Sequence, residues 1–218
     1  MSIREVRKVN DARCVTVLGA MSADDWSRPS LCDRWSNHEV LAHLVAGLDA
    51  SLRDMTGAMA RHRGSFDEAN AEMARQLAAQ RQPADLLDDF ARLSRSPRGL
   101  GRYFPPRLLL GDHVTHELDI VLALDRPPAV APEALVAVLG TQVHVPNPFV
   151  PAFATARGLR LRSTDVDWRH GTRGPVVEGY AADLVSVLGN RLKALPRLRG
   201  DGVAVLEARL RNPTRTGG

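Results

Sequence analysis

The chain has 218 residues, of which 44% are hydrophobic and 25% charged, and its formal net charge is +4. This composition excludes an intrinsically disordered protein, because the chain holds enough apolar surface for a core and carries little excess charge. No apolar run has the length of a secretory signal or a membrane span, so we expect a cytoplasmic protein. A chain of this size can fold without a stabilising disulfide bond, and Cys14 and Cys32 are both expected to be thiols in the core.

The N-terminal region begins with a predicted helix from Ile3 to about Met21, where apolar residues recur at helical spacing. A segment rich in turn-forming residues follows it. Two tryptophans in this segment, Trp26 and Trp35, are expected to dock it onto the neighbouring helices as a loop.

The second helix has a clear start signal. Ser36-Asn37-His38-Glu39 has the form of a capping box, in which serine and glutamate side chains satisfy the free amide groups of a helix start. The apolar stripe that follows predicts a helix continuing through Leu52. His43 lies within this helix, among leucine and valine residues.

Three more helices are predicted before residue 128. Ser65 and Glu68 repeat the capping-box form and open a helix to about Gln80. Pro83 suits the first turn of the next helix, and helical spacing returns from about residue 106 to 124. Residues 1–128 are therefore predicted to form a helical bundle with short connections.

The pattern changes after the proline pair at 127–128. A helix is predicted over 132–143, strands over 159–164 and 176–179, and a helix over 180–195, while 203–210 fits either a helix or a strand. Residues 129–218 are therefore expected to form a small α+β domain. This part of the chain carries more basic than acidic residues, but it contains no nucleic-acid-binding motif. We therefore expect no nucleic-acid partner.

One pattern in the first domain suits metal binding. Asp112 and His116 are one helical turn apart, so their side chains can converge on one point. His43, from another helix, would complete three protein ligands with an open position, as in catalytic zinc sites. An i, i+4 pair also arises often by chance, and a histidine on an apolar face more often hydrogen-bonds a neighbour. His113 is an alternative partner for His116. In that case Asp112 would be exposed to solvent or would support a ligand without binding the metal itself.

The order of several motifs resembles the mycothiol-dependent maleylpyruvate isomerase family, within the DinB-like metal-binding bundles. The segments that carry the resemblance are Trp26 to Leu44, Gly111 to Ile120 and, in the second domain, Leu159 to Trp168, Gly179 to Leu184 and Leu198 to Val203. The resemblance implies an α+β protein: a DinB-like up-down bundle followed by a C-terminal domain of the maleylpyruvate isomerase type.

The resemblance also implies a divalent metal, usually zinc. It would be held by a histidine of the second helix and by a pair on the last helix, in which an acid or a histidine stands four residues before a histidine. These positions are His43, Asp112 and His116. The family commonly has glutamate or histidine where this chain has Asp112, and aspartate reaches less far. That difference could shift the metal, admit water as a ligand or bring in His113.

The implied chemistry uses mycothiol or a similar thiol as cosubstrate, held as a thiolate by the metal. The thiolate would isomerise a small substrate or be transferred to it. Arg191 matches a family Gly-Arg position and would bind an anionic substrate, although Asn190 stands where glycine is usual. A surface salt bridge is the ordinary role for such an arginine.

Two other functions fit the same residues. One is a metal-dependent hydrolase that uses metal-bound water. The other is a metal-binding or regulatory protein without catalytic activity. The sequence does not indicate the substrate or the oligomeric state.

Overall fold

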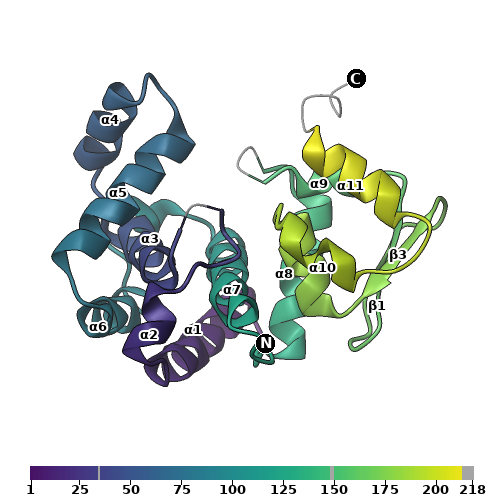
Figure 1. The fold of residues 1–218 in the computed structure, drawn as a ribbon, viewed down its shortest axis with the longest axis horizontal. Coiled ribbons are helices and arrows are strands. Elements are labelled where there is room, and N and C mark those ends of the chain that lie inside the picture. Colours follow the sequence, from purple (N-terminus) through teal and green to yellow (C-terminus); the bar gives the residue numbers. More distant parts are fainter. Residues whose placement is uncertain (34, 148–149, 213–218) are drawn as a thin grey trace. The chain divides into compact units, whose positions relative to one another are not determined.

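The computed structural model describes residues 1–33, 35–147 and 150–212. The chain divides into two compact units, residues 1–129 and 130–218. The first is helical, and the second combines helices with a small sheet (Figure 1). This agrees with the α+β class predicted from the sequence. Among the described residues, no helix is both long and apolar enough to cross a membrane.

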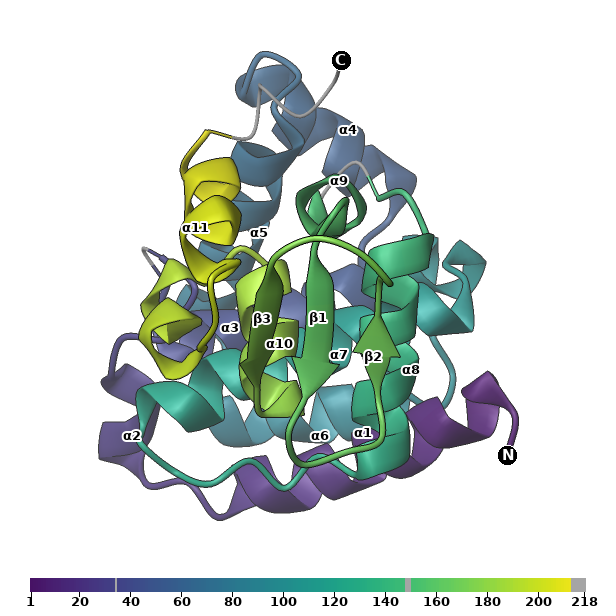
Figure 2. The same ribbon diagram turned by 90° about the vertical axis from the view of Figure 1, so that its right-hand side faces the viewer.

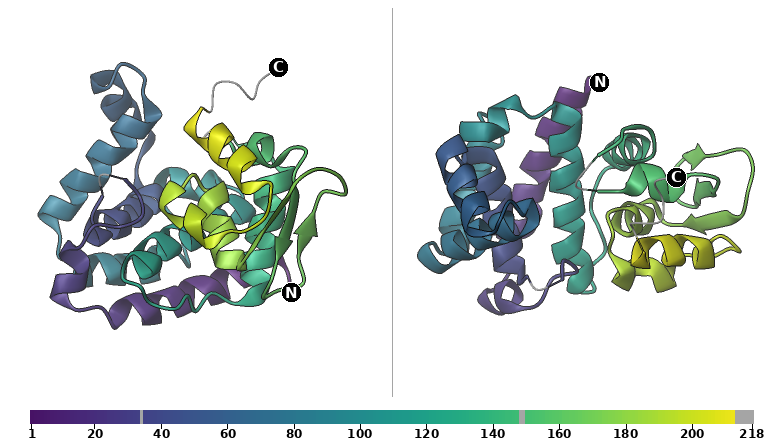
Figure 3. Two further views of the ribbon diagram at one scale, coloured as in Figure 1. Left: turned by 45° about the vertical axis from the view of Figure 1, so that its right-hand side comes forward. Right: turned by 90° about the horizontal axis from the view of Figure 1, so that it is seen from above.

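The first unit is a helical bundle. Its elements are α1 (Ile3–Gly19), α2 (Ala23–Ser27), α3 (Asn37–Asp49), α4 (Leu52–Arg61), α5 (Phe66–Gln80), α6 (Pro83–Leu93), the 3-10 helix η1 (Gly99–Tyr103) and α7 (Pro106–Ala123). Helix α3 packs against α5, α6 and α7, and α1 packs against α6 and α7. The α1–α7 pair is seen side by side in the right-hand view of Figure 3. Helix α3 therefore lies at the centre of this unit.

Serine residues start five of these helices. At α5 the Ser65 hydroxyl accepts the Glu68 N–H at 3.3 Å, which is one half of the capping box predicted there. In the other four the serine hydroxyl accepts the backbone N–H three residues later, and the acid at that position accepts the serine N–H. The pairs are Ser2–Glu5, Ser22–Asp25, Ser36–Glu39 and Ser51–Asp54. These reciprocal bonds satisfy amide groups that a helix start leaves free.

The second helix is shorter than predicted. It ends at Asp49, and Ser51 caps a separate helix, α4. The apolar stripe continues to Leu52, but Ser51 and Asp54 form another capping box, which starts a new helix. Segment 23–27, predicted as loop, is also a short helix.

The second unit packs helices beside a three-stranded sheet. Its elements are α8 (Pro132–His144), α9 (Ala152–Ala156), β1 (Arg160–Ser163), β2 (Arg169–His170), β3 (Val176–Gly179), α10 (Ala181–Leu188), η2 (Leu192–Arg197) and α11 (Val203–Arg211). The strand order is β2-β1-β3, with β1 antiparallel to β2 and parallel to β3 (Figure 2). Leu161 and Val177 are paired and buried, and α10 packs on β3 and α8.

Two predictions for this unit change. The helix predicted over 180–195 ends at Leu188, because Asn190 takes a left-handed backbone with φ 69° that an α-helix cannot continue. The ambiguous segment after Gly202 is a helix.

Candidate metal centre

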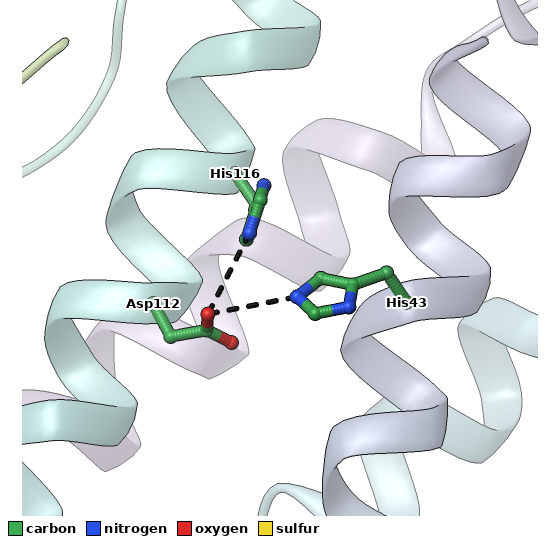
Figure 4. A group of neighbouring side chains, drawn as sticks. All are labelled: His43, Asp112 and His116. Carbon is green, nitrogen blue, oxygen red and sulfur yellow. Dashed lines mark ion pairs between the residues drawn. The ribbon is translucent and has the colours of Figure 1, made fainter. Parts of the chain in front are cut away.

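Three side chains from two packed helices meet in the first unit (Figure 4). His43 lies on α3, while Asp112 and His116 lie one turn apart on α7. One potential ligand atom from each residue lies within 4.8 Å of the other two. The structure therefore brings together the three residues that the sequence singled out.

The carboxylate of Asp112 faces both imidazoles. Its Oδ1 lies 3.6 Å from Nε2 of His43 and 3.6 Å from Nε2 of His116. The imidazoles meet edge to face, with ring centroids 4.5 Å apart. These 3.6 Å contacts are ion-pair contacts, longer than an ordinary hydrogen bond, and the three groups face a common point.

The other nitrogen of each imidazole has a partner outside this group. Nδ1 of His116 donates to Oδ2 of Asp119 at 2.9 Å, and Nδ1 of His43 donates to Oδ1 of Asn70, on α5, at 3.2 Å. A neutral imidazole that donates through Nδ1 keeps a lone pair on Nε2. In this tautomer the lone pair of each ring lies on the nitrogen that faces Asp112.

The charges of the group suit a cation. Burial opposes ionisation of Asp112, but the adjacent His43 and His116 outweigh it and hold the pKa of the carboxyl well below its usual range. Burial, together with the neighbouring His43, lowers the pKa of His116. Near neutral pH the aspartate is therefore an anion and His116 is uncharged, and these are the forms that bind metals.

Trp35 packs beside both histidines. Its ring centroid lies 5.0 Å from that of His43 and 6.1 Å from that of His116. The Ser30 N–H donates to the Trp35 carbonyl at 2.9 Å, and the Leu31 N–H donates to the Asp119 carbonyl at 3.0 Å. The tryptophan loop is thus tied to the same turn of α7 that supports His116.

His113 lies outside the group. Its Nδ1 is 2.8 Å from Oδ1 of Asp11 on α1, its ring meets Phe90 edge to face, and it is buried. Arg7 donates to the other carboxylate oxygen of Asp11 at 2.7 Å. The alternative in which His113 replaces Asp112 does not fit this arrangement, because the ring points from α7 toward α1.

Glu117 is occupied by a buried ion pair. Both of its carboxylate oxygens accept from the guanidinium of Arg13 on α1, one at 2.6 Å. Cys14 is buried beside this pair, and burial raises the pKa of its thiol well above the usual range. Glu117 and Cys14 therefore belong to the α1–α7 contact, and Cys14 is no thiolate nucleophile at neutral pH.

Arg191 lies in the second unit, directly before η2, and its guanidinium donates to the Gly189 carbonyl. Asn190 before it has φ 69°, a left-handed conformation that asparagine tolerates better than most residues. The left-handed backbone at residue 190 therefore suits asparagine as well as glycine. The role of Arg191 toward a substrate stays a prediction.

The remaining histidines have local contacts. Nε2 of His38 lies 3.0 Å from the Arg81 carbonyl, Nε2 of His62 lies 2.7 Å from Glu72, and Nδ1 of His144 lies 2.9 Å from the Gly140 carbonyl. His170 packs edge to face on His144. These contacts are local and lie away from the group formed by His43, Asp112 and His116.

The comparisons with known proteins support the resemblance seen in the sequence. Residues 10–98 match the family described as the mycothiol maleylpyruvate isomerase N-terminal domain. This range contains His43, while Asp112 and His116 lie beyond it. No curated protein sequence matches the chain.

Two solved structures share the fold. One is the crystal structure of a mycothiol-dependent maleylpyruvate isomerase with a histidine-to-alanine mutation, with a TM-score of 0.55, 15% identity and 91% of each chain covered. The other is the crystal structure of the mycothiol-dependent maleylpyruvate isomerase, with a TM-score of 0.53, 16% identity, and 87% of this chain and 88% of that chain covered. The likeness extends over both units of the chain.

Proposed function

We propose that this chain, whose residues 10–98 match the family described as the mycothiol maleylpyruvate isomerase N-terminal domain, is a metal-dependent enzyme that uses a low-molecular-weight thiol. Its substrate would be small and electrophilic or anionic, and the reaction an isomerisation or an S-transfer. The observation that carries the proposal is the convergence of His43, Asp112 and His116 on one point.

The donor set fits zinc. Two imidazole nitrogens and one carboxylate oxygen are ligands that Zn²⁺ accepts, and three protein ligands leave one tetrahedral position open. The hydrogen bonds from Nδ1 of His43 and His116 hold both rings with Nε2 facing the centre. A cation bound there would supply the positive charge that keeps a thiol ionised near neutral pH.

The surrounding residues would divide the remaining tasks. Trp35 places an apolar ring against both imidazoles and would limit the access of water to the reacting thiol. We assign binding of a substrate anion to Arg191, in a C-terminal domain that we propose to be of the maleylpyruvate isomerase type. Arginine suits this task because its guanidinium binds carboxylates through two parallel hydrogen bonds.

Kinetics with and without thiol test the proposal. Chelator-treated protein would be reloaded with Zn²⁺ and assayed on maleylpyruvate with mycothiol, with glutathione and without thiol. We expect turnover only when both metal and thiol are present. Conversion that needs the metal but proceeds equally fast without thiol would overturn the thiol mechanism and favour a hydrolase.

The fluorescence of Trp35 should report metal binding. Co²⁺ at the site would lie close to the indole and is expected to quench its emission, with an end point at one equivalent. Trp35→Phe should abolish most of the quenching, while Trp168→Phe, a matched change in the second unit, should retain it. Full quenching in Trp35→Phe would place the ion elsewhere.

A further inference from the structure

We infer that Asn70 is a positioning residue that fixes the tautomer of His43 without adding charge to the metal site. The inference rests on the proposed function. The spacing of residues in the sequence does not indicate that Asn70 contacts His43. Asn70 lies on α5, and its only described link to the site is the 3.2 Å contact from its Oδ1 to Nδ1 of His43.

The Asn70 contact determines the tautomer of His43. An amide oxygen can only accept, so the contact requires a proton on Nδ1 of His43. The ring then has its lone pair on Nε2, the atom that faces Asp112 at 3.6 Å. Loss of the Asn70 oxygen would remove this acceptor from Nδ1 of His43, and the ring could then turn or change tautomer.

The two histidines have different partners at Nδ1. Nδ1 of His116 donates to Asp119 at 2.9 Å, and the Asp119 side chain is fully buried. Asp119 is a carboxylate and Asn70 is a neutral amide. The two histidines are therefore supported by partners of similar shape and different charge.

The charge at position 70 also matters for an anionic ligand. Asp112 and Asp119 already place two carboxylates beside the histidines. A further carboxylate at position 70 would add negative charge next to His43 and would repel an incoming thiolate. A neutral acceptor orients His43 and leaves the site able to attract an anionic ligand.

Substitutions at position 70 separate these effects. Asn70→Leu keeps the size but removes the acceptor, and we expect it to weaken Co²⁺ binding about 10–100-fold, as loss of an outer hydrogen bond does in other metal sites. Asn70→Asp restores the acceptor and should bind Co²⁺ at least as tightly as the wild type. With Co²⁺ in place, Asn70→Asp should bind a small thiol more weakly than the wild type does. Gln76→Leu, an exposed change on the same helix, should alter neither affinity.

A second measurement examines the ring directly. Nitrogen-15 NMR of the metal-free protein should show His43 protonated at Nδ1 in the wild type and in larger part at Nε2 in Asn70→Leu. Asn70→Ala would repeat both measurements if Asn70→Leu failed to fold.

The outcomes distinguish the inference from the proposal beneath it. Wild-type protein that binds no Co²⁺ would overturn both the proposed function and the positioning role. Wild-type protein that binds Co²⁺, with Asn70→Leu of equal affinity and unchanged tautomer, would overturn the inference alone. If Co²⁺-loaded Asn70→Asp bound the thiol as tightly as the wild type does, the proposed effect of charge at position 70 would be overturned.

Discussion

Alanine in place of either histidine, His43→Ala or His116→Ala, is expected to weaken Zn²⁺ binding by more than about 100-fold. Each change removes one of three protein ligands, which costs more than the 10–100-fold loss typical of an outer hydrogen bond. Competition with a chromophoric chelator would measure the affinity. The two variants should behave alike, because both histidines face the same Asp112 oxygen at 3.6 Å.

His38→Ala provides the matched control. His38 also lies on α3, but its Nε2 contacts the Arg81 carbonyl and not the site. This variant should bind Zn²⁺ as the wild type does, and circular dichroism would verify that all three variants fold. Wild-type affinity in His43→Ala or His116→Ala would refute the ligand assignment.

Arg13→Met is expected to lower the free energy of unfolding by about 3–5 kcal/mol, because it leaves the Glu117 carboxylate buried without its ion-pair partner. The Glu117 side chain is 0% exposed and that of Arg13 is 22% exposed. Urea denaturation followed by circular dichroism would measure the loss.

The double variant Arg13→Met/Glu117→Leu should recover most of this stability. It removes the buried charge together with its partner, and such apolar replacements are often close to neutral. A loss below about 1 kcal/mol in Arg13→Met alone would show that Glu117 finds other compensation. Stability that does not recover in the double variant would show that the loss comes from packing of the Arg13 side chain instead.

The helices of the first unit were largely predictable, because local signals specify them. The capping box at Ser36 and Glu39 marks the start of α3, and Pro83 marks that of α6. The end of α3 was harder to see. The apolar stripe continued to Leu52, and only the second capping box at Ser51 shows where the chain starts a new helix.

The candidate ligands were also accessible to sequence reasoning, but their surroundings were not. Asp112 and His116 share a face because they are four residues apart, and the same geometry turns His113 toward α1. Asn70 carries no signal, since its role depends on α5 packing against α3. Such contacts between separate helices have no counterpart in residue spacing.

The central claim is that one cation binds between α3 and α7 of the first unit. The most direct test is a crystal structure of zinc-loaded protein with anomalous diffraction data recorded at the zinc edge. We expect a peak about 2.0–2.2 Å from Nε2 of His43, Nε2 of His116 and a carboxylate oxygen of Asp112. A zinc peak bound elsewhere, or no peak in protein soaked with excess Zn²⁺, would contradict it.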